Sequence, residues 1–242
     1  MEYNNYLKEL QKIASQIAFV LERNFVGFYV TGSFVMNAWN EKTSDIDFIV
    51  VTYKPLNEEE IVALVPLHQN FQRSETGKKL EGEYIDLASL QLLDFESLKI
   101  TNVQNGKLEA DSECRLSADN VLCLIQFGKV FIGKPVTELN LFVSQEQYTN
   151  ALRGMLWEEK MKVIETNNFY ELYDVLINTL RCIYGIQTKK LPTKAEAIQH
   201  SQKEIGEELY NNIINFRNGN IQQFKLDKNN INYLINCGLA YK

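Results

Sequence analysis

Apolar residues in the first part of the chain recur at two different spacings, which predict alternating helices and strands. Leu7, Leu10, Ile13, Ile17 and Val20 lie three or four residues apart, as on one face of a helix that we expect from Asn5 to about Glu22. Shorter apolar runs predict strands, and acidic or polar stretches predict further helices between them. The expected strands are Phe25–Thr31, Asp45–Thr52 and Glu81–Leu87. The expected helices are Ser33–Trp39 and a helix that opens at Asn57–Glu60 and runs towards Phe71, with an interruption at Pro66.

The pattern changes further along the chain, where strand signals disappear. Residues 91–119 show no clear period and are expected to include long loops, whereas residues 120–133 indicate an apolar helix or a helix followed by a strand. The later segments Val143–Trp157, Leu172–Tyr184 and Lys194 to about Arg217 predict helices, with Gly185 as the stop of the middle one. We therefore expect an α+β protein, with a mixed α/β domain at residues 1–140 and an all-α domain at residues 141–242.

Composition and charge narrow the functional classes. The 242 residues carry a net charge of −6, which argues against nucleic acid as the main partner and is compatible with a small cationic substrate. Only two histidines are present, so a histidine-rich zinc site or a serine triad is not expected. The four cysteines lack C-x-x-C spacing, and no segment indicates a signal peptide or a membrane span. We expect a cytoplasmic protein that binds neither nucleic acid nor membrane.

Candidate chemistry concentrates between Val30 and Thr52. Asp45 and Asp47 lie two residues apart at the start of an expected strand, so their side chains point to the same face. Two neighbouring carboxylates repel each other unless a cation lies between them, and Mg²⁺ bound together with phosphates is the natural partner. Gly32 and Ser33 precede this strand in a turn whose free backbone N–H groups favour a phosphate. The alternative is a solvated acidic strand end beside a glycine turn.

A third carboxylate is expected on the next strand. Residues 81–87 alternate, which places Glu81 and Glu83 on one face of a strand beside the first two. Either glutamate could then face the pair formed by Asp45 and Asp47. The competing interpretation is an edge strand whose glutamates are solvated.

Two features of the second half also suggest a binding site. Glu171, Asp174, Asn178 and Arg181 fall on one stripe of an otherwise apolar helix, which forms either its solvent side or the wall of a substrate cleft between the two domains. Thr193 is an expected N-cap, so Lys194 lies at a helix N-terminus, either as an ordinary exposed lysine or as a phosphate ligand.

Taken together, these motifs resemble those of the aminoglycoside adenylyltransferases that act on streptomycin and spectinomycin, within the polymerase-β-like nucleotidyltransferases. The resemblance rests on Gly32-Ser33, on Ser44-Asp45-Ile46-Asp47, on Leu80-Glu81, and on Thr179-Leu180-Arg181 followed by Thr193-Lys194-Ala195-Glu196-Ala197. It implies a nucleotidyltransferase domain with a mixed sheet and flanking helices, followed by a helical-bundle domain that binds the substrate.

The resemblance also implies roles for individual residues. Ser33 and Ser44, with the turn at Gly32, would contact the phosphates of ATP, and Lys194 would hold phosphate from the other domain. Asp45, Asp47 and Glu81 would bind Mg²⁺. Glu81 would be the catalytic base, although Glu83 shares its face and competes for the role. Glu171 would grip substrate ammonium groups, with Asp174 beside it.

Two departures leave the acceptor open. The segment from Phe34 to Trp39 lacks the glycines usual before the acidic strand, and no counterpart of the family's substrate-stacking aromatic residue is found near Asn105 to Lys107. We expect a monomeric, Mg²⁺-dependent enzyme that transfers AMP from ATP to a hydroxyl of an aminoglycoside and so confers antibiotic resistance. The alternatives are transfer to another small molecule or to a protein hydroxyl, and a non-catalytic nucleotide-binding protein.

Overall fold

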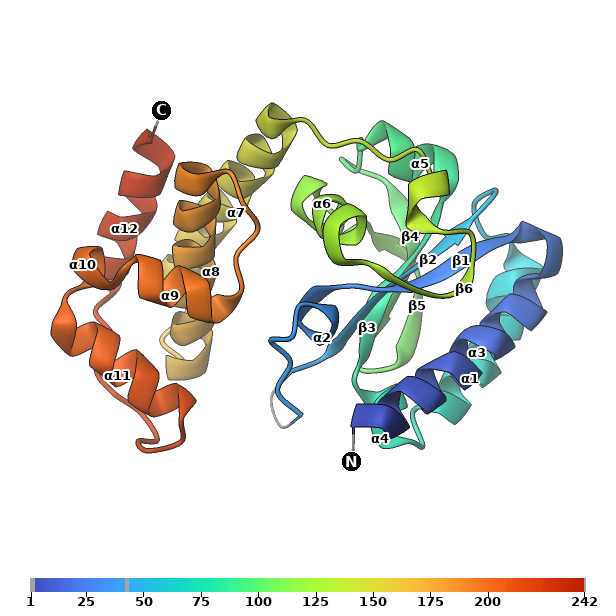
Figure 1. Cartoon of the computed structure of the whole chain (residues 1–242), viewed down its shortest axis with the longest axis horizontal. Helices are drawn as coiled ribbons and strands as arrows, with labels where there is room; N and C mark the ends of the chain where they lie inside the picture. Colours follow the sequence, from blue (N-terminus) through green and yellow to red (C-terminus); the bar gives the residue numbers. More distant parts are fainter. Residues whose placement is uncertain (1–2, 42–43, 242) are drawn as a thin grey trace. The chain divides into compact units, whose positions relative to one another are not determined.

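The fold consists of two compact units, Met1–Val143 and Ser144–Lys242. It is known from a computed structural model that describes residues 3–41 and 44–241 (Figure 1).

The first unit is built on a six-stranded sheet with the order β5-β4-β3-β2-β1-β6. Its strands are β1 (Phe25–Val30), β2 (Ile46–Thr52), β3 (Leu80–Asp86), β4 (Lys99–Gln104), β5 (Lys107–Glu113) and β6 (Lys129–Gly133). Within the described residues, β2 and β3 run parallel and the other neighbouring strands are antiparallel. The expected mixed sheet is therefore confirmed.

Helices cover both faces of this sheet (Figure 1). They are α1 (Tyr3–Leu21), α2 (Gly32–Val35), α3 (Glu58–Phe71), α4 (Glu75–Lys78), α5 (Leu87–Leu92) and α6 (Ala118–Phe127), with 3-10 turns at Glu22–Asn24 and Val136–Glu138. On one face, α1 and α3 pack on Phe28, Phe48 and Tyr84. On the other face, α5 and α6 pack on Ile49 and Ile85.

Strand alternation decides where the acidic residues lie. In β2, Ile46, Phe48 and Val50 enter the core under α1 and α3, whereas Ile49 and Val51 enter the core under α6. Asp47 therefore belongs to the α6 side of the sheet, because it is two residues from Ile49. The same alternation in β3 places Glu81 and Glu83 on the side of Ile85.

The second unit is helical throughout its described part. It contains α7 (Gln145–Glu165), α8 (Phe169–Thr188), α9 (Lys194–His200), α10 (Gln202–Ile205), α11 (Glu207–Arg217) and α12 (Lys228–Ala240). The expected order of an α/β part followed by a helical part is confirmed. No helix in the described part of the chain is long and apolar enough to cross a membrane.

Several details of the predicted elements are wrong. Helix α3 continues through Pro66, because this proline is on the exposed side of the helix, where water can satisfy the carbonyl left without a partner. Gly185 does not stop α8, which continues to Thr188. A Cβ at Gly185 would lie 2.5 Å from Leu152 and from Tyr148, so the missing side chain lets α7 and α8 approach closely.

Two further predictions fail because of local breaks and missed strands. The single helix expected from Lys194 to Arg217 is three helices, and Gly206, with φ of +80°, separates the last two. Residues 91–119 contain the β4–β5 hairpin in place of long loops. Residues 120–133 are the predicted helix followed by a strand, with β6 pairing to β1 at an edge of the sheet.

Candidate active site

Gly32 places the turn after β1 directly against the side chain of Asp47. Its φ is +64°, a conformation that favours glycine, and a Cβ built on it would lie 2.0 Å from Asp47 Oδ2. The backbone N–H of Thr31 also donates to the Asp47 carbonyl at 2.9 Å. Helix α2 then begins at Gly32, carries the half-buried Ser33 and ends at Val35, well before the predicted end at Trp39. The turn therefore fits only a residue without a side chain.

Ser44 and Asp45 form the entry to β2. The Ser44 N–H donates to the Asn40 carbonyl at 2.8 Å, and the Ser44 hydroxyl accepts from the Asn40 N–H at 3.1 Å. The serine hydroxyl keeps its own proton for a further acceptor, such as a phosphate oxygen. Asp45 is exposed and Asp47 is half-buried, so both carboxylates can meet a ligand that arrives from solvent.

Glu81 lies directly beside Asp47 in the parallel β2–β3 pair. The register pairs Asp47 with Glu81 and Ile49 with Glu83. Burial raises the pKa of Glu81 to about 7, and repulsion from Asp45 and Asp47 adds to the effect. Burial, followed by the charge of Asp47, likewise raises the pKa of Glu83 to about 7. The structure thus brings together the four acids that the sequence singled out in the first half of the chain.

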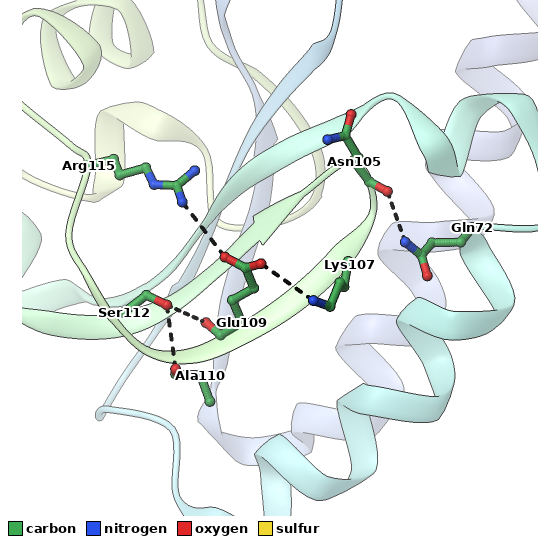
Figure 2. A network of polar contacts seen from close by, with 7 residues as sticks. All are labelled: Gln72, Asn105, Lys107, Glu109, Ala110, Ser112 and Arg115. Carbon is green, nitrogen blue, oxygen red and sulfur yellow. Dashed lines mark hydrogen bonds and ion pairs between the residues drawn. The ribbon is translucent and has the colours of Figure 1, made fainter. Parts of the chain in front are cut away.

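The β4–β5 hairpin extends this acidic row and was missed by the sequence patterns. Across β3, β4 and β5, Glu83 pairs with Asn102, which in turn pairs with Glu109. Figure 2 shows Glu109 between Lys107 and Arg115, whose guanidinium nitrogen is 3.8 Å from Glu109 Oε2. The positive charge of Arg115 opposes the rise in the pKa values of Glu81 and Glu83. Arg115 is therefore a cation beside the acids that no motif pointed to.

The acids of β2 and β3 repel one another, which would favour a bound cation. Among residues 3–41 and 44–241, no group of three or more His, Cys, Asp or Glu side chains is arranged to hold a metal ion. Burial contributes most to the raised pKa of Glu81, and the negative charges of Asp45 and Asp47 contribute next. A bound cation would relieve this repulsion between the carboxylates. Oxygen ligands of this kind suit Mg²⁺, which usually takes few protein carboxylates and completes its shell with phosphates and water.

Lys194 and the acids of α8 lie near each other in the helical unit. Thr193 is the N-cap of α9, as predicted, and its hydroxyl accepts from the Glu196 N–H at 3.2 Å in a capping box with Glu196. Burial raises the pKa of Asp174, while the charges of Lys194 and Lys162 lower it. A predicted phosphate ligand and a predicted substrate ligand therefore share one electrostatic environment.

A cavity of about 490 Å³ lies between α7 and α8. Its lining includes Glu171, Asp174 and Asn178 from the polar stripe of α8, and Glu159, Lys162 and Glu165 from α7. The Glu171 carboxylate accepts from the Thr166 hydroxyl at the rim. Four carboxylates against one lysine make the cavity suited to an organic cation.

Glu159 contributes a buried carboxylate to the lining of this cavity. The side chain is buried, and its Oε1 accepts from Lys162 Nζ at 2.9 Å and from Asn178 Nδ2 at 3.2 Å. Its Oε2 is buried without a hydrogen-bond partner among the described residues. Glu171, Asp174 and Asn178 of the polar stripe line this cavity, whereas Arg181 does not. The cavity lies within the helical unit, so the predicted cleft between the two domains stays a prediction.

Comparison with known proteins supports the nucleotidyltransferase fold. Residues 7–108 match the family model described as "Nucleotidyltransferase domain", a stretch that contains Gly32, Asp47 and Glu81. No match was found among curated proteins.

Two solved structures align with much of this chain. The crystal structure of the spectinomycin adenyltransferase AAD(9) from Enterococcus faecialis with ATP and spectinomycin is similar, with a TM-score of 0.67 and 17% sequence identity over 98% of this chain and 97% of that one. At this identity the likeness shows the fold. A toxin–antitoxin structure with AMP-PNP covers 61% of this chain and 97% of its own at 17% identity, but its TM-score of 0.31 is too low to support an argument.

Proposed function

The chain carries a nucleotidyltransferase domain followed by a helical region, and from this premise we propose that it transfers AMP from ATP to a hydroxyl of an aminoglycoside or aminocyclitol of the spectinomycin or streptomycin class. Such a reaction would confer antibiotic resistance. The observation that carries the proposal is the pairing of Asp47 with Glu81 on adjacent parallel strands, against the glycine turn at Gly32.

In this proposal Glu81 is the general base. A base works best when its pKa is close to the ambient pH, and the pKa of Glu81 of about 7 meets this condition. Its place opposite Asp47 brings it next to the residues that would hold the nucleotide. Glu83 has a similar pKa and lies one pleat further along the strand, so we assign it to the acceptor hydroxyls and keep it as the competing base.

The nucleotide would be held by residues around the acid pair. Asp45, Asp47 and Glu81 would bind Mg²⁺, which, when bound, neutralises charge on the transferring phosphate and on the leaving pyrophosphate. Gly32 and Ser33 leave backbone N–H groups of the turn for phosphate oxygens, and the Ser44 hydroxyl can donate to one. For Lys194, at the start of α9, the role of phosphate ligand is proposed from the family resemblance alone.

The acceptor would use the acidic cavity of the helical unit. Glu171 and Asp174 line it and would pair with ammonium groups of the substrate. A volume of about 490 Å³ is within the range for small-molecule sites. The cavity and its charge favour an amino-sugar or aminocyclitol over an anionic acceptor.

One rival keeps the chemistry and changes the acceptor. The hairpin turn at Asn105 and Gly106 offers no aromatic side chain for stacking on a sugar ring, which favours a different small molecule or a protein hydroxyl. A rival of another class is a nucleotide-binding protein without catalysis, which would bind ATP and release no pyrophosphate.

The test is mass spectrometry of spectinomycin and of streptomycin after incubation with the full chain, ATP and Mg²⁺. We expect the mass of one AMP group to be added to one of them, with release of pyrophosphate. Asp47→Ala should abolish the product, whereas Asp94→Ala, which changes an exposed aspartate outside the site, should not. Full activity of a folded Asp47→Ala protein would refute the mechanism, and ATP binding without pyrophosphate release from any acceptor would favour the non-catalytic rival.

A further inference from the structure

The entry to β2 at Asp45 is held by an indole ring. Trp39 Nε1–H donates to the backbone carbonyl of Asp45 at 3.0 Å. The ring itself is held edge-on against Tyr6 and Phe34, with centroid distances of 4.8 Å and 5.2 Å. Tyr6 and Phe34 are buried in the core under α1, so the indole cannot move without disturbing that core. The carbonyl of Asp45 is thereby fixed to a rigid part of the domain.

Lys79 is a second residue that holds this segment. Its ammonium group donates to the carbonyl of Ser44 at 3.2 Å and lies 5.9 Å from the centroid of the Trp39 ring. Its backbone carbonyl accepts from the Ile46 N–H at 2.7 Å. Lys79 directly precedes β3, whose second residue is Glu81. One residue therefore connects the start of β2 to the start of β3.

We propose that Trp39 and Lys79 are positioning residues of the transferase site, which fix the distance between Asp45 at the entry to β2 and Glu81 at the entry to β3. The inference rests on the function proposed above. Asp45 precedes the first residue of β2, so the sheet ladder alone does not fix its carboxylate. The two carbonyls held by Trp39 and Lys79 belong to Ser44 and Asp45 themselves. Loss of either donor would let this segment turn away and weaken binding of Mg²⁺.

The anchoring of Asp45 also explains why the sequence before β2 contains bulky residues. The segment from Phe34 to Trp39 carries bulky residues where a flexible connection would favour glycine. Phe34 and Trp39 are the two residues of this segment that pack together, and Trp39 provides the N–H donor. The two aromatic residues of this segment therefore serve to anchor Asp45, in addition to burying apolar surface.

The experiment compares Trp39→Phe and Lys79→Met with Lys79→Arg in the full chain. Trp39→Phe keeps an aromatic ring and removes the N–H donor, Lys79→Met keeps the stem and removes the ammonium group, and Lys79→Arg restores a cationic donor. Matched controls are Trp157→Phe, at the exposed tryptophan of α7, and Lys78→Met, at a lysine whose partner is Glu75. Circular dichroism checks that each protein is folded.

Two readouts separate positioning from general stability. The first is the Mg²⁺ concentration for half-maximal binding of a fluorescent ATP analogue, which needs no acceptor, and the second is the rate of AMP transfer at low and at saturating Mg²⁺. We expect half-saturation to rise about tenfold or more in Trp39→Phe and Lys79→Met, because supporting residues of metal ligands usually contribute this much. Lys79→Arg and both controls should stay within about twofold of the wild type.

The outcomes distinguish this inference from the proposed function. If folded Trp39→Phe and Lys79→Met proteins bind Mg²⁺ and nucleotide like the wild type, the positioning role is refuted, even where AMP transfer is demonstrated. If the wild type transfers no AMP but the two variants still lose Mg²⁺-dependent nucleotide binding, the positioning role stands and the transferase proposal falls. If the Lys78→Met control shifts as much as Lys79→Met, the effect is a general loss of positive charge and the inference is wrong.

Discussion

Acidification should remove the contribution that one buried histidine makes to the stability of the first unit. His68 of α3 is 1% exposed, and its Nδ1 is 3.1 Å from the carbonyl of Gly106. Because a carbonyl can only accept, Nδ1 carries the proton, and the neutral Nε2 accepts from the Tyr84 hydroxyl at 2.7 Å. Burial lowers the pKa of His68 to about 4. Protonation would place a positive charge in the core and make Nε2 a donor, so the Tyr84 hydroxyl would have to turn its own proton away in order to accept.

The size of the effect follows from linkage. The pKa of His68 is depressed in the folded state, so its contribution to stability is complete above the unfolded value of 6.5 and is lost as the pH falls towards 4. The full difference corresponds to about 3 kcal/mol, of which about 2 kcal/mol is lost between pH 7 and pH 5. Glu81 and Glu83 act in the opposite direction, because their pKa values are raised to about 7 and their contribution falls as the pH rises. The histidine must therefore be isolated by difference.

The assay is urea unfolding of His68→Gln and of its parent at pH 5, 6 and 7, without added metal. Both proteins carry Trp157→Phe, so that Trp39, the other of the two tryptophans, reports on the first unit alone. We expect the loss of unfolding free energy caused by His68→Gln to be about 2 kcal/mol smaller at pH 5 than at pH 7. A difference between the two proteins that stays constant over this range would refute the assignment of a neutral, buried imidazole.

Three predictions concern the proposed site. Gly32→Ala should lower the transfer rate about 100-fold or more, because the added Cβ would lie 2.0 Å from Asp47 Oδ2 and would push that carboxylate aside. Gly154→Ala, at a glycine with open space around it, should leave the rate unchanged. Glu81→Gln should lower kcat by about 10²- to 10⁴-fold with little change in KM. The wild-type rate should fall on acidification at a pH below about 7, because the base must be ionised and bound Mg²⁺ would lower its pKa. An unchanged pH profile in Glu81→Gln would transfer the role to Glu83. Glu171→Gln should raise the KM for spectinomycin about fivefold, because the loss of an exposed ion pair costs about 1 kcal/mol. Glu158→Gln, on the exposed side of α7, should leave the KM unchanged. Equal effects of the two substitutions would show that the cavity does not bind the substrate.

The acidic strands could be predicted from the sequence because alternation is a local property. Asp45, Asp47, Glu81 and Glu83 follow from period-two patterns, and β2 and β3 are neighbours as expected. The hairpin at residues 99–113 also had a local signal, since Asn105 and Gly106 both have positive φ in its turn and Asn-Gly is a common hairpin dipeptide. The residues on either side of the turn still predict loops, because β5 is polar and partly exposed and gives no apolar alternation.

Other features depended on contacts between distant residues. Arg115 has no motif around it and becomes interesting only when folding brings it beside Glu109 and the acids of β3. The anchoring of Asp45 by Trp39 likewise depends on where the indole packs. Gly185 has the residue type of a helix stop, and only the close approach of Leu152 and Tyr148 explains its place inside a helix. Such roles cannot be predicted from one chain segment at a time.

The two outer strands of the sheet are poor templates for growth by strand addition. Strand β5 carries a charged residue at every second position, at Lys107, Glu109, Asp111 and Glu113, and a register shift interrupts its pairing with β4. At the opposite edge, Gln11 of α1 donates to the backbone carbonyl of Phe131 in β6 at 3.2 Å. A second polypeptide that tried to extend the sheet would meet charge and a bulge on one side and an occupied carbonyl on the other. The domain can therefore keep a polar hairpin exposed beside its acidic site without seeding fibrillar assembly.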